Sequence, residues 1–271
     1  MTNPRAERVR QVAALAGRPA RERSGRFLVE GPQAVREAVR FAARSLRSLY
    51  LSDEAAARHP EIEAEAAEAG LSVRRGTAAV LDAMSPDAQG VLAVADRLTT
   101  TLEEATRRQP RLVALLAHVR DPGNAGTVVR VADAVGGGAV VLSSSSVDVH
   151  NPKVVRATAG SLFHLPVVTG VALPAAVGAL RAAGLTVLAA DGRGNLDLDD
   201  LLDAAGGAAP GEPDLAGPTA WLFGNEAWGL PDGVLTLADA VVRVPIRGRA
   251  ESLNLATAAA ICLYASARAQ R

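Results

Sequence analysis

The segment that decides the fold is residues 112–133, which read LVALLAHVRDPGNAGTVVRVAD. Six apolar residues from Leu112 to Ala117 predict a buried strand, and the apolar spacing from 125 to 135 predicts a helix. Glycines in the turn between them let backbone N–H groups approach an anion at the start of the helix. A strand, a glycine-rich turn and a helix in this order indicate a parallel sheet with its ligand site at the carboxyl ends of the strands.

The same alternation of strands and helices continues on both sides of this segment. Towards the C-terminus, strands are predicted at 138–142, 165–168, 185–190, 219–223 and 240–244, and helices near 151–161, 173–183 and 252–268. Towards the N-terminus, strands are predicted at 26–30, 46–51, 71–74 and 90–95, and helices at 4–16, 35–42, 53–69 and 77–83. The polar residues 97–110 read as a linker. The sequence therefore predicts an α/β protein with a small domain at 1–96, a linker at 97–110 and a parallel-sheet domain at 111–271.

Composition limits the class of protein. The chain has 271 residues, 29 basic and 29 acidic residues and one cysteine. A disulfide scaffold is excluded because Cys262 has no partner in the chain, and we expect it to be buried in the last helix. No apolar run is long enough to predict a membrane span, and no secretory leader is recognisable, so we expect a cytoplasmic protein.

The balanced charge conceals a basic N-terminus. Residues 1–50 contain eleven arginines and four acidic residues. Guanidinium groups bind phosphate in a forked geometry, so the arginines around Pro19 and Gly25 are candidates for nucleic-acid contacts. A solvated, poorly ordered arm explains the same pattern.

Three loops after predicted strands carry candidate site residues. In the first, Asn124 and Gly126 precede Arg130, an arginine that reaches a ligand or simply extends to solvent from an apolar helix. It lacks the dinucleotide and P-loop fingerprints. The second runs from Gly224 through Glu226 to Gly229, either beside a ligand or as a tight turn. The third contains Ser252, Leu253 and Asn254, with Ser252 as the candidate N-cap of the last helix and Asn254 in its first turn.

Together these loops resemble the three signature motifs of the SpoU (TrmH) family of RNA ribose 2'-O-methyltransferases, in the SPOUT superfamily. The motif residues are Asn124, Gly126 and Arg130, then Gly224, Glu226, Gly229 and Leu230, then Ser252, Leu253 and Asn254. The resemblance implies a parallel α/β domain with a deep trefoil knot, which composition and periodicity do not show. It departs from the family pattern at Ala227, Trp228 and Ile246. We expect Trp228 to stack on a nucleobase or to pack at a dimer interface.

The resemblance also implies a mechanism and a cofactor. A ribose hydroxyl must be aligned and must lose its proton before it can accept a methyl group. In the family, the arginine that matches Arg130 activates this hydroxyl. Because arginine rarely loses its own proton, Arg130 as an orienting group stays an alternative. Asn124, Glu226, Ser252 and Asn254 are predicted to complete the catalytic site. Backbone groups of Gly224, Val244 and Leu253 are predicted to hold S-adenosyl-L-methionine.

Residues 27–38 (FLVEGPQAVREA) resemble the opening of the substrate-binding domain of many SpoU enzymes. This resemblance favours a structured RNA substrate, ribosomal RNA more than tRNA. The candidate phosphate contacts are Arg10, Arg18, Arg21, Arg23 and Arg26. We expect a homodimer through the knotted domain, no membrane association and no metal site, because His118, His150 and His164 lack metal-ligand spacing.

Three other functions stay open on the sequence. A tRNA ribose 2'-O-methyltransferase would share every motif. A catalytically silent RNA-binding protein on the same fold is disfavoured, because all the candidate catalytic residues are present. An NAD-dependent oxidoreductase is disfavoured by the missing dinucleotide fingerprint.

Overall fold

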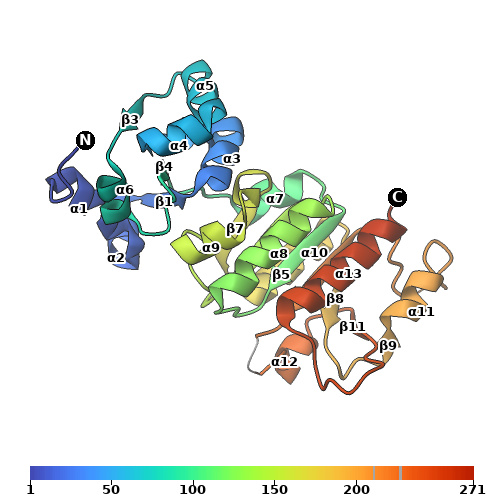
Figure 1. Cartoon of the computed structure of the whole chain (residues 1–271). Coiled ribbons are helices and arrows are strands. Elements are labelled where there is room, and N and C mark those ends of the chain that lie inside the picture. The colour runs from blue at the N-terminus through green and yellow to red at the C-terminus, as the bar shows by residue number, and fades with distance from the viewer. Residues whose placement is uncertain (210, 226–227) are drawn as a thin grey trace. The chain divides into compact units, whose positions relative to one another are not determined.

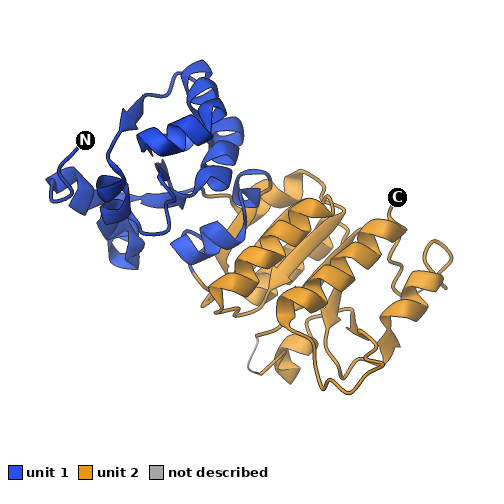
Figure 2. Ribbon diagram, in the orientation of Figure 1, with its two compact units in different colours: residues 1–98, 148–164 blue, residues 99–147, 165–271 orange. Residues whose placement is uncertain are grey.

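The computed structural model describes residues 1–209, 211–225 and 228–271. The chain divides into two compact units, shown in blue and orange in Figure 2. Unit 1 comprises Met1–Leu98 together with Asp148–His164, and unit 2 comprises Thr99–Val147 together with Leu165–Arg271. A segment from the middle of the sequence is therefore part of the N-terminal unit, which local sequence patterns do not indicate.

Unit 1 is built on a four-stranded sheet in the order β1-β4-β2-β3. The strands are β1 (Arg26–Glu30), β2 (Leu46–Leu51), β3 (Val73–Arg75) and β4 (Val91–Asp96), and β4 runs antiparallel to both of its neighbours. Its helices are α1 (Glu7–Ala13), α2 (Arg18–Ser24), α3 (Pro32–Ala42), α4 (Asp53–Arg58), α5 (Pro60–Glu68), α6 (Ala78–Met84) and α9 (Pro152–Ala157). Buried side chains of α1, α6 and one sheet face form a common apolar core.

Two helices of unit 1 differ from the sequence-based prediction. The single helix predicted at 53–69 is interrupted at His59, because Pro60 disfavours a helical conformation in the residue before it. Residues 18–24, considered as a phosphate-binding segment or a disordered arm, form α2. Pro19 suits the first turn of this helix, and Gly25 ends it in the left-handed region at φ +67°. The basic segment is therefore ordered and folded against the unit.

Unit 2 is built on a seven-stranded sheet in the order β7-β6-β5-β10-β8-β11-β9. The strands are β5 (Leu112–Leu116), β6 (Ala139–Ser143), β7 (Val167–Val171), β8 (Thr186–Ala190), β9 (Leu196–Asp197), β10 (Thr219–Phe223) and β11 (Ala240–Arg243). Every pair of neighbours is parallel, which confirms the predicted α/β fold. The last strands of the chain are thus inserted between earlier ones.

Helices cover both faces of this sheet. They are α7 (Leu102–Arg107), α8 (Pro122–Ala134), α10 (Leu173–Ala182), α11 (Leu198–Asp203), α12 (Asp232–Leu235) and α13 (Leu255–Ala269). Helices α8 and α13 lie side by side on one face (Figure 1). On that face the Trp221 indole donates a buried hydrogen bond of 2.8 Å to the Ser266 hydroxyl of α13. The alternate residues Ala220 and Leu222 join the core beneath α10 on the other face.

The stretch 97–110, predicted as a linker, contains α7. Thr101 and Glu104 form a reciprocal capping box at the start of this helix. Thr100 pairs with Val168 beside β7, and α7 packs against α10. The helix has a single buried residue, Ala105, so its sequence lacks the apolar periodicity that identifies longer helices.

Candidate functional site

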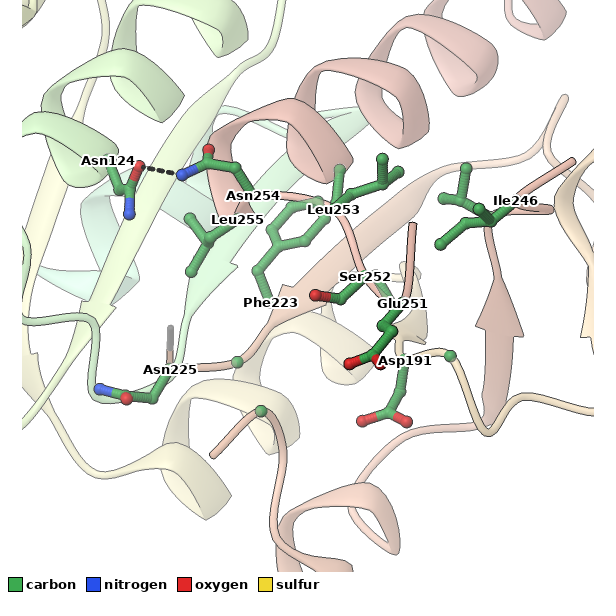
Figure 3. Close-up of a pocket in the computed structure, with 16 residues that line it drawn as sticks. Asn124, Asp191, Phe223, Asn225, Ile246, Glu251, Ser252, Leu253, Asn254 and Leu255 are labelled. Carbon is green, nitrogen blue, oxygen red and sulfur yellow. Dashed lines mark hydrogen bonds between the residues drawn. The ribbon is translucent and has the colours of Figure 1, made fainter. Parts of the chain in front are cut away.

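A cavity of about 520 Å³ opens at the carboxyl ends of β8, β10 and β11 (Figure 3). Its wall comes from residues directly after these strands and from the segment before α13; these include Asn124, Asp191, Gly192, Phe223, Gly224, Asn225, Val244, Ile246 and Glu251–Leu255. Parallel strands end at one edge of a sheet, so loops far apart in the sequence meet there. A cavity therefore lies where the sequence predicted the ligand site.

Gly224 lets the loop after β10 fold tightly against itself. A Cβ atom on this residue would lie 2.5 Å from the Gly229 carbonyl oxygen and 2.8 Å from the Leu230 nitrogen. Asn225 and Gly229 exchange two backbone hydrogen bonds of 3.0 and 2.9 Å, and Gly229 adopts φ +65°. Both motif glycines are therefore required by backbone geometry, as expected where a loop borders a ligand.

The start of α13 differs in detail from the prediction. Asn254, not Ser252, is the N-cap: its Oδ1 accepts hydrogen bonds from the backbone N–H groups of Ala256 and Thr257. The same side chain donates from Nδ2 to Asn124 Oδ1 at 3.0 Å, the dashed line in Figure 3. Ser252 precedes the helix and lines the cavity. The first and third motifs are thus joined directly.

Asn124 itself lies in the first turn of α8. Asp121 is the N-cap of this helix, and its carboxylate accepts a hydrogen bond of 2.7 Å from the Asn124 backbone N–H. The side chain of Asn124 is therefore not needed as the cap, and it lines the cavity instead. An asparagine before a helix can serve as its cap or as a side-chain ligand, but here the cap is Asp121 and not Asn124.

Asp191 lines the cavity, and Arg193 supports this carboxylate without lining the cavity itself. The Asp191 carboxylate lines the cavity and accepts a hydrogen bond of 2.9 Å from Arg193 Nε. Arg193 also pairs with Asp232 and donates to the Leu230 carbonyl, so it joins the loops after β8 and β10. Burial opposes ionisation of Asp191, but the hydrogen bonds from Arg193 outweigh it and lower the pKa of this carboxyl. The cavity therefore has a charged carboxylate in its wall at neutral pH.

Asn225 is another residue that the sequence did not single out. It is buried, lines the cavity and donates from Nδ2 to the His118 carbonyl at 2.7 Å. This bond holds the loop after β10 against the loop after β5. The sequence feature that could have identified Asn225 is its position directly after Gly224, at the end of a buried strand.

Arg130 is a predicted catalytic residue that lies away from the cavity wall. Arg130 is exposed on α8 and does not line the cavity. Among the described residues its side chain has no hydrogen-bond or ion-pair partner. Glu226 lies outside the described residues. Ser252, Asn254 and Asn124 do meet at the cavity, together with the three predicted cofactor contacts, Gly224, Val244 and Leu253.

Four of the five candidate phosphate contacts of unit 1 are exposed, namely Arg10, Arg18, Arg23 and Arg26. Arg21 contradicts the prediction: it is 2% exposed and pairs with Asp148 at 2.8 Å. Its remaining nitrogen donates to the backbone carbonyls of Leu15 and Ala16. Because Arg21 is buried and each of its three side-chain nitrogens donates inside the unit, it is not available to bind phosphate. Arg18 pairs with Glu22 on the surface of α2.

Asp148 is the centre of a buried polar cluster in unit 1. Burial opposes its ionisation, but hydrogen bonds from His150 and Arg21 outweigh this and hold the pKa of the carboxyl well below its ordinary value. Burial also lowers the pKa of His150, an effect that Asp148 offsets only in part. The ring of His150 accepts a hydrogen bond from the Leu98 backbone N–H. These contacts hold Asp148–His164 in unit 1.

The walls of the cavity fit a nucleoside-type cofactor. Phe223, Val244 and Ile246 provide apolar surface, while Asp191, Glu251 and Ser252 provide polar groups around it. A volume of this size is within the range of small-molecule sites, which combine an apolar lining with a few polar groups.

Among the described residues there is no cluster of His, Cys, Asp or Glu that could hold a metal ion. Nor does any helix in the described part of the chain have the length and apolar character to cross a membrane. Cys262 is buried, as predicted, and burial raises the pKa of its thiol.

Comparison with known proteins agrees with this site. Residues 111–264 match the SpoU rRNA Methylase family, and residues 6–93 match the MRM3-like substrate binding domain. The chain is 33% identical to the 23S rRNA (uridine(2479)-2'-O)-methyltransferase of Streptomyces viridochromogenes, over 94% of this chain and 87% of that protein. It is 32% identical to the 23S rRNA (guanosine(2553)-2'-O)-methyltransferase RlmP of Bacillus subtilis (strain 168), with 95% of each covered.

Two solved structures share the fold over nearly the whole chain. One is the AdoMet-bound rRNA methyltransferase from Sinorhizobium meliloti, with a TM-score of 0.82, 27% identity and coverage of 99% of this chain and 97% of that one. The other is the SpoU methyltransferase AviRb from Streptomyces viridochromogenes in complex with AdoMet. Its TM-score is 0.80, at 31% identity, with 97% of this chain and 98% of that one covered.

The fold and the site define a parallel α/β protein with a cavity for a small ligand at the carboxyl ends of its strands. The chain belongs to the SpoU rRNA methylase family. It is an RNA ribose 2'-O-methyltransferase that uses S-adenosyl-L-methionine.

Proposed function

We propose that this enzyme methylates a ribose 2'-hydroxyl in 23S ribosomal RNA. The observation that carries this proposal is the cavity lined by all three family motifs, in a chain that aligns along 94% of its length with a 23S rRNA methyltransferase. Bound S-adenosyl-L-methionine supplies an electrophilic methyl group. The residues of the chain must bind this cofactor, orient the ribose and manage the proton of its hydroxyl.

The loops around the cavity are suited to holding the cofactor. Backbone groups of Gly224, Val244 and Leu253 border the cavity and are the proposed contacts. The charged Asp191 carboxylate is a further contact for a cationic or hydroxyl group of the cofactor. Asn124, Ser252 and Asn254 are proposed to position the ribose, and Glu226 is proposed to bind an arginine or the RNA.

Arg130 is proposed to orient the target hydroxyl and an adjacent phosphate. Its guanidinium is exposed and unpaired among the described residues, so its donors are available to RNA. Direct proton abstraction by Arg130 stays the alternative. Arg130→Lys keeps the positive charge but loses the forked donor geometry. The methyl-transfer activity of this variant therefore shows whether the charge or the donor geometry of Arg130 is required.

A homodimer through unit 2 is also proposed. Ile261 and Tyr264 of α13 are 38% and 57% exposed, one helical turn apart. Removal of such apolar side chains from water on a second copy of this face would stabilise association. Light scattering of Tyr264→Arg would show a monomer if the face with Ile261 and Tyr264 is the interface.

We further propose that the C-terminal segment forms the family's trefoil knot, since β10 is inserted between β5 and β8 late in the chain.

Unit 1 is proposed to bind RNA, and unit 2 to carry the methyltransferase chemistry, in the cytoplasm. The match of residues 6–93 to a substrate-binding domain supports the first assignment. The exposed arginines of α1 and α2 support it independently, because phosphate contacts supply much of the affinity for RNA.

The test uses the full-length protein with tritiated S-adenosyl-L-methionine and three separate RNA pools: 23S rRNA, 16S rRNA and tRNA. We expect transfer to 23S rRNA, at one position resistant to alkaline hydrolysis. Transfer only to tRNA would identify the alternative substrate. Cofactor binding without transfer to any pool would indicate a silent RNA-binding protein. Arg130→Ala should reduce transfer by about 100-fold or more while the cofactor Kd stays within twofold.

A further inference from the structure

A second cavity, of about 470 Å³, lies wholly within unit 1. It is enclosed by α1, the turn after it, α2 and one face of the sheet. Its lining includes Arg8, Gln11, Val12, Leu15, Arg23, Ser24 and Arg26 from the N-terminal helices and β1, and Ser48, Tyr50 and Val94 from β2 and β4. No family motif of the methyltransferase site contributes to it.

The floor of this cavity is largely apolar, with the hydroxyl-bearing residues Ser48 and Tyr50 of β2 in its lining. Val12, Leu15 and Val94 are at most 6% exposed, and Tyr50 is 1% exposed. Among the described residues, every fully buried side-chain nitrogen or oxygen atom has a hydrogen-bond partner. The Tyr50 hydroxyl has no partner in this part of the chain, so its oxygen is not fully buried. The hydroxyl therefore keeps some contact with solvent, and Tyr50 lines the cavity. A buried tyrosine normally satisfies its O–H group, so this one is placed to bond a ligand.

The rim of the cavity carries uncompensated positive charge. In the described structure Arg8 and Arg23 form no ion pair and no side-chain hydrogen bond. Arg26 lies 3.8 Å from Asp96, but that carboxylate already accepts hydrogen bonds from Arg47. The nearby Glu22 is paired with Arg18. Phosphate groups are the anions that such a set of guanidinium groups binds well.

We infer that this cavity binds one unstacked nucleotide of the RNA substrate, an inference that rests on the proposed function. The base lies on the apolar floor with its edge hydrogen-bonded to Tyr50, and the flanking phosphates contact Arg8 and Arg23. Proteins read RNA sequence mainly from unpaired bases that leave the stack and enter such pockets. A free phosphate would use the rim alone, whereas a nucleotide uses both the rim and the floor.

The test compares Tyr50→Phe, Arg8→Ala and Arg23→Ala in the full chain with Arg44→Ala, a control that removes an exposed arginine of unit 1 outside the cavity. The probe is a 23S rRNA transcript, measured by filter binding and by transfer kinetics. We expect Arg8→Ala and Arg23→Ala to raise the RNA Kd and KM about tenfold, with kcat and the cofactor Kd within twofold. Each should reduce the salt dependence of binding by about one counterion. Tyr50→Phe should raise the RNA Kd several-fold without changing the salt dependence of binding. The control Arg44→Ala should change the RNA Kd less than twofold.

A second arm separates base recognition from phosphate binding. Dodecamers of random RNA sequence and of abasic ribose phosphate are compared. Tyr50→Phe should weaken binding of the RNA dodecamer only, since an abasic strand offers no base edge to the hydroxyl. Equal effects on both strands, or affinities of all three cavity variants within twofold of the wild type, would overturn the inference. A wild-type protein that binds no RNA would instead refute the proposed function.

Discussion

Asn254 Nδ2 donates a hydrogen bond of 3.0 Å to Asn124 Oδ1 and so joins the N-terminus of α13 to that of α8. Asn254 performs two functions with one side chain, because its Oδ1 caps α13 while its Nδ2 reaches the neighbouring helix. This contact brings residues 130 positions apart in sequence to the edge of the cofactor cavity.

The two functions of Asn254 can be separated by substitution. Serine is as good an N-cap as asparagine but is too short to reach Asn124, whereas alanine does neither. We expect Asn254→Ala to lower the free energy of unfolding by about 1 kcal/mol, and Asn254→Ser to preserve it. Both should reduce methyl transfer about tenfold if the contact positions the ribose. Urea unfolding and single-turnover kinetics measure the two effects, and full activity in the serine variant would show that only the cap matters.

Gly224 predicts a steric effect on cofactor binding. The Cβ of Gly224→Ala would meet the backbone of Gly229 and Leu230, so the loop bordering the cavity must shift. We expect the affinity for S-adenosyl-L-methionine to fall by about 100-fold, equivalent to roughly 3 kcal/mol. Gly233→Ala in α12 is the control, because a Cβ there meets no atom within 4 Å. Calorimetric titration that finds equal affinities for the two variants would contradict the steric explanation.

Arg21 and Arg23 lie two residues apart on α2 and predict opposite phenotypes. Arg21 is buried and paired with Asp148, whereas Arg23 is exposed. Removing one partner of a buried pair leaves an unpaired charge, so Arg21→Ala should lower the free energy of unfolding by about 3 kcal/mol. Arg23→Ala should change it by less than about 0.5 kcal/mol, as is usual for exposed positions. Similar stabilities of the two variants in urea would be the contrary result.

Asp148 and His150 predict that stability falls in acid. The folded-state pKa of Asp148 lies below 3.8 and that of His150 below 6.5, so the unfolded chain binds their protons first as the pH falls. The contribution of His150 therefore begins to decrease below about pH 6.5, and that of Asp148 below about pH 4. Both are fully present at higher pH.

The measurement for this prediction is the urea midpoint and slope from pH 7 to pH 3. Asp148→Asn should be less stable at pH 7 and should show a smaller loss of stability below pH 4. An unchanged acid limb in this variant would mean that other carboxyls govern acid unfolding.

The strands, the parallel sheet and the loops that line the cavity were predictable from the sequence. Apolar runs such as Leu112–Leu116 are buried on both faces of the sheet, so each can be recognised from a few consecutive residues. Polar and glycine residues directly after such strands then predict a site, because parallel strands end at one edge. Arg193 escaped this reasoning because its partners, Asp232 and the Leu230 carbonyl, come from a different loop.

Contacts between distant segments set which polar residues face the cavity and which stabilise the fold. Arg21 and Arg23 have similar local sequence environments, and Ser252 and Asn254 both have side chains that can cap a helix, although the sequence favoured Ser252. Their functions differ because α2 turns Arg21 towards Asp148, and because α13 begins where Asn254 can reach Asn124. Local patterns report a residue's own periodicity and conformational preference. They do not report the partner that distant segments bring to it, and for a buried charge or an amide the partner sets the energy.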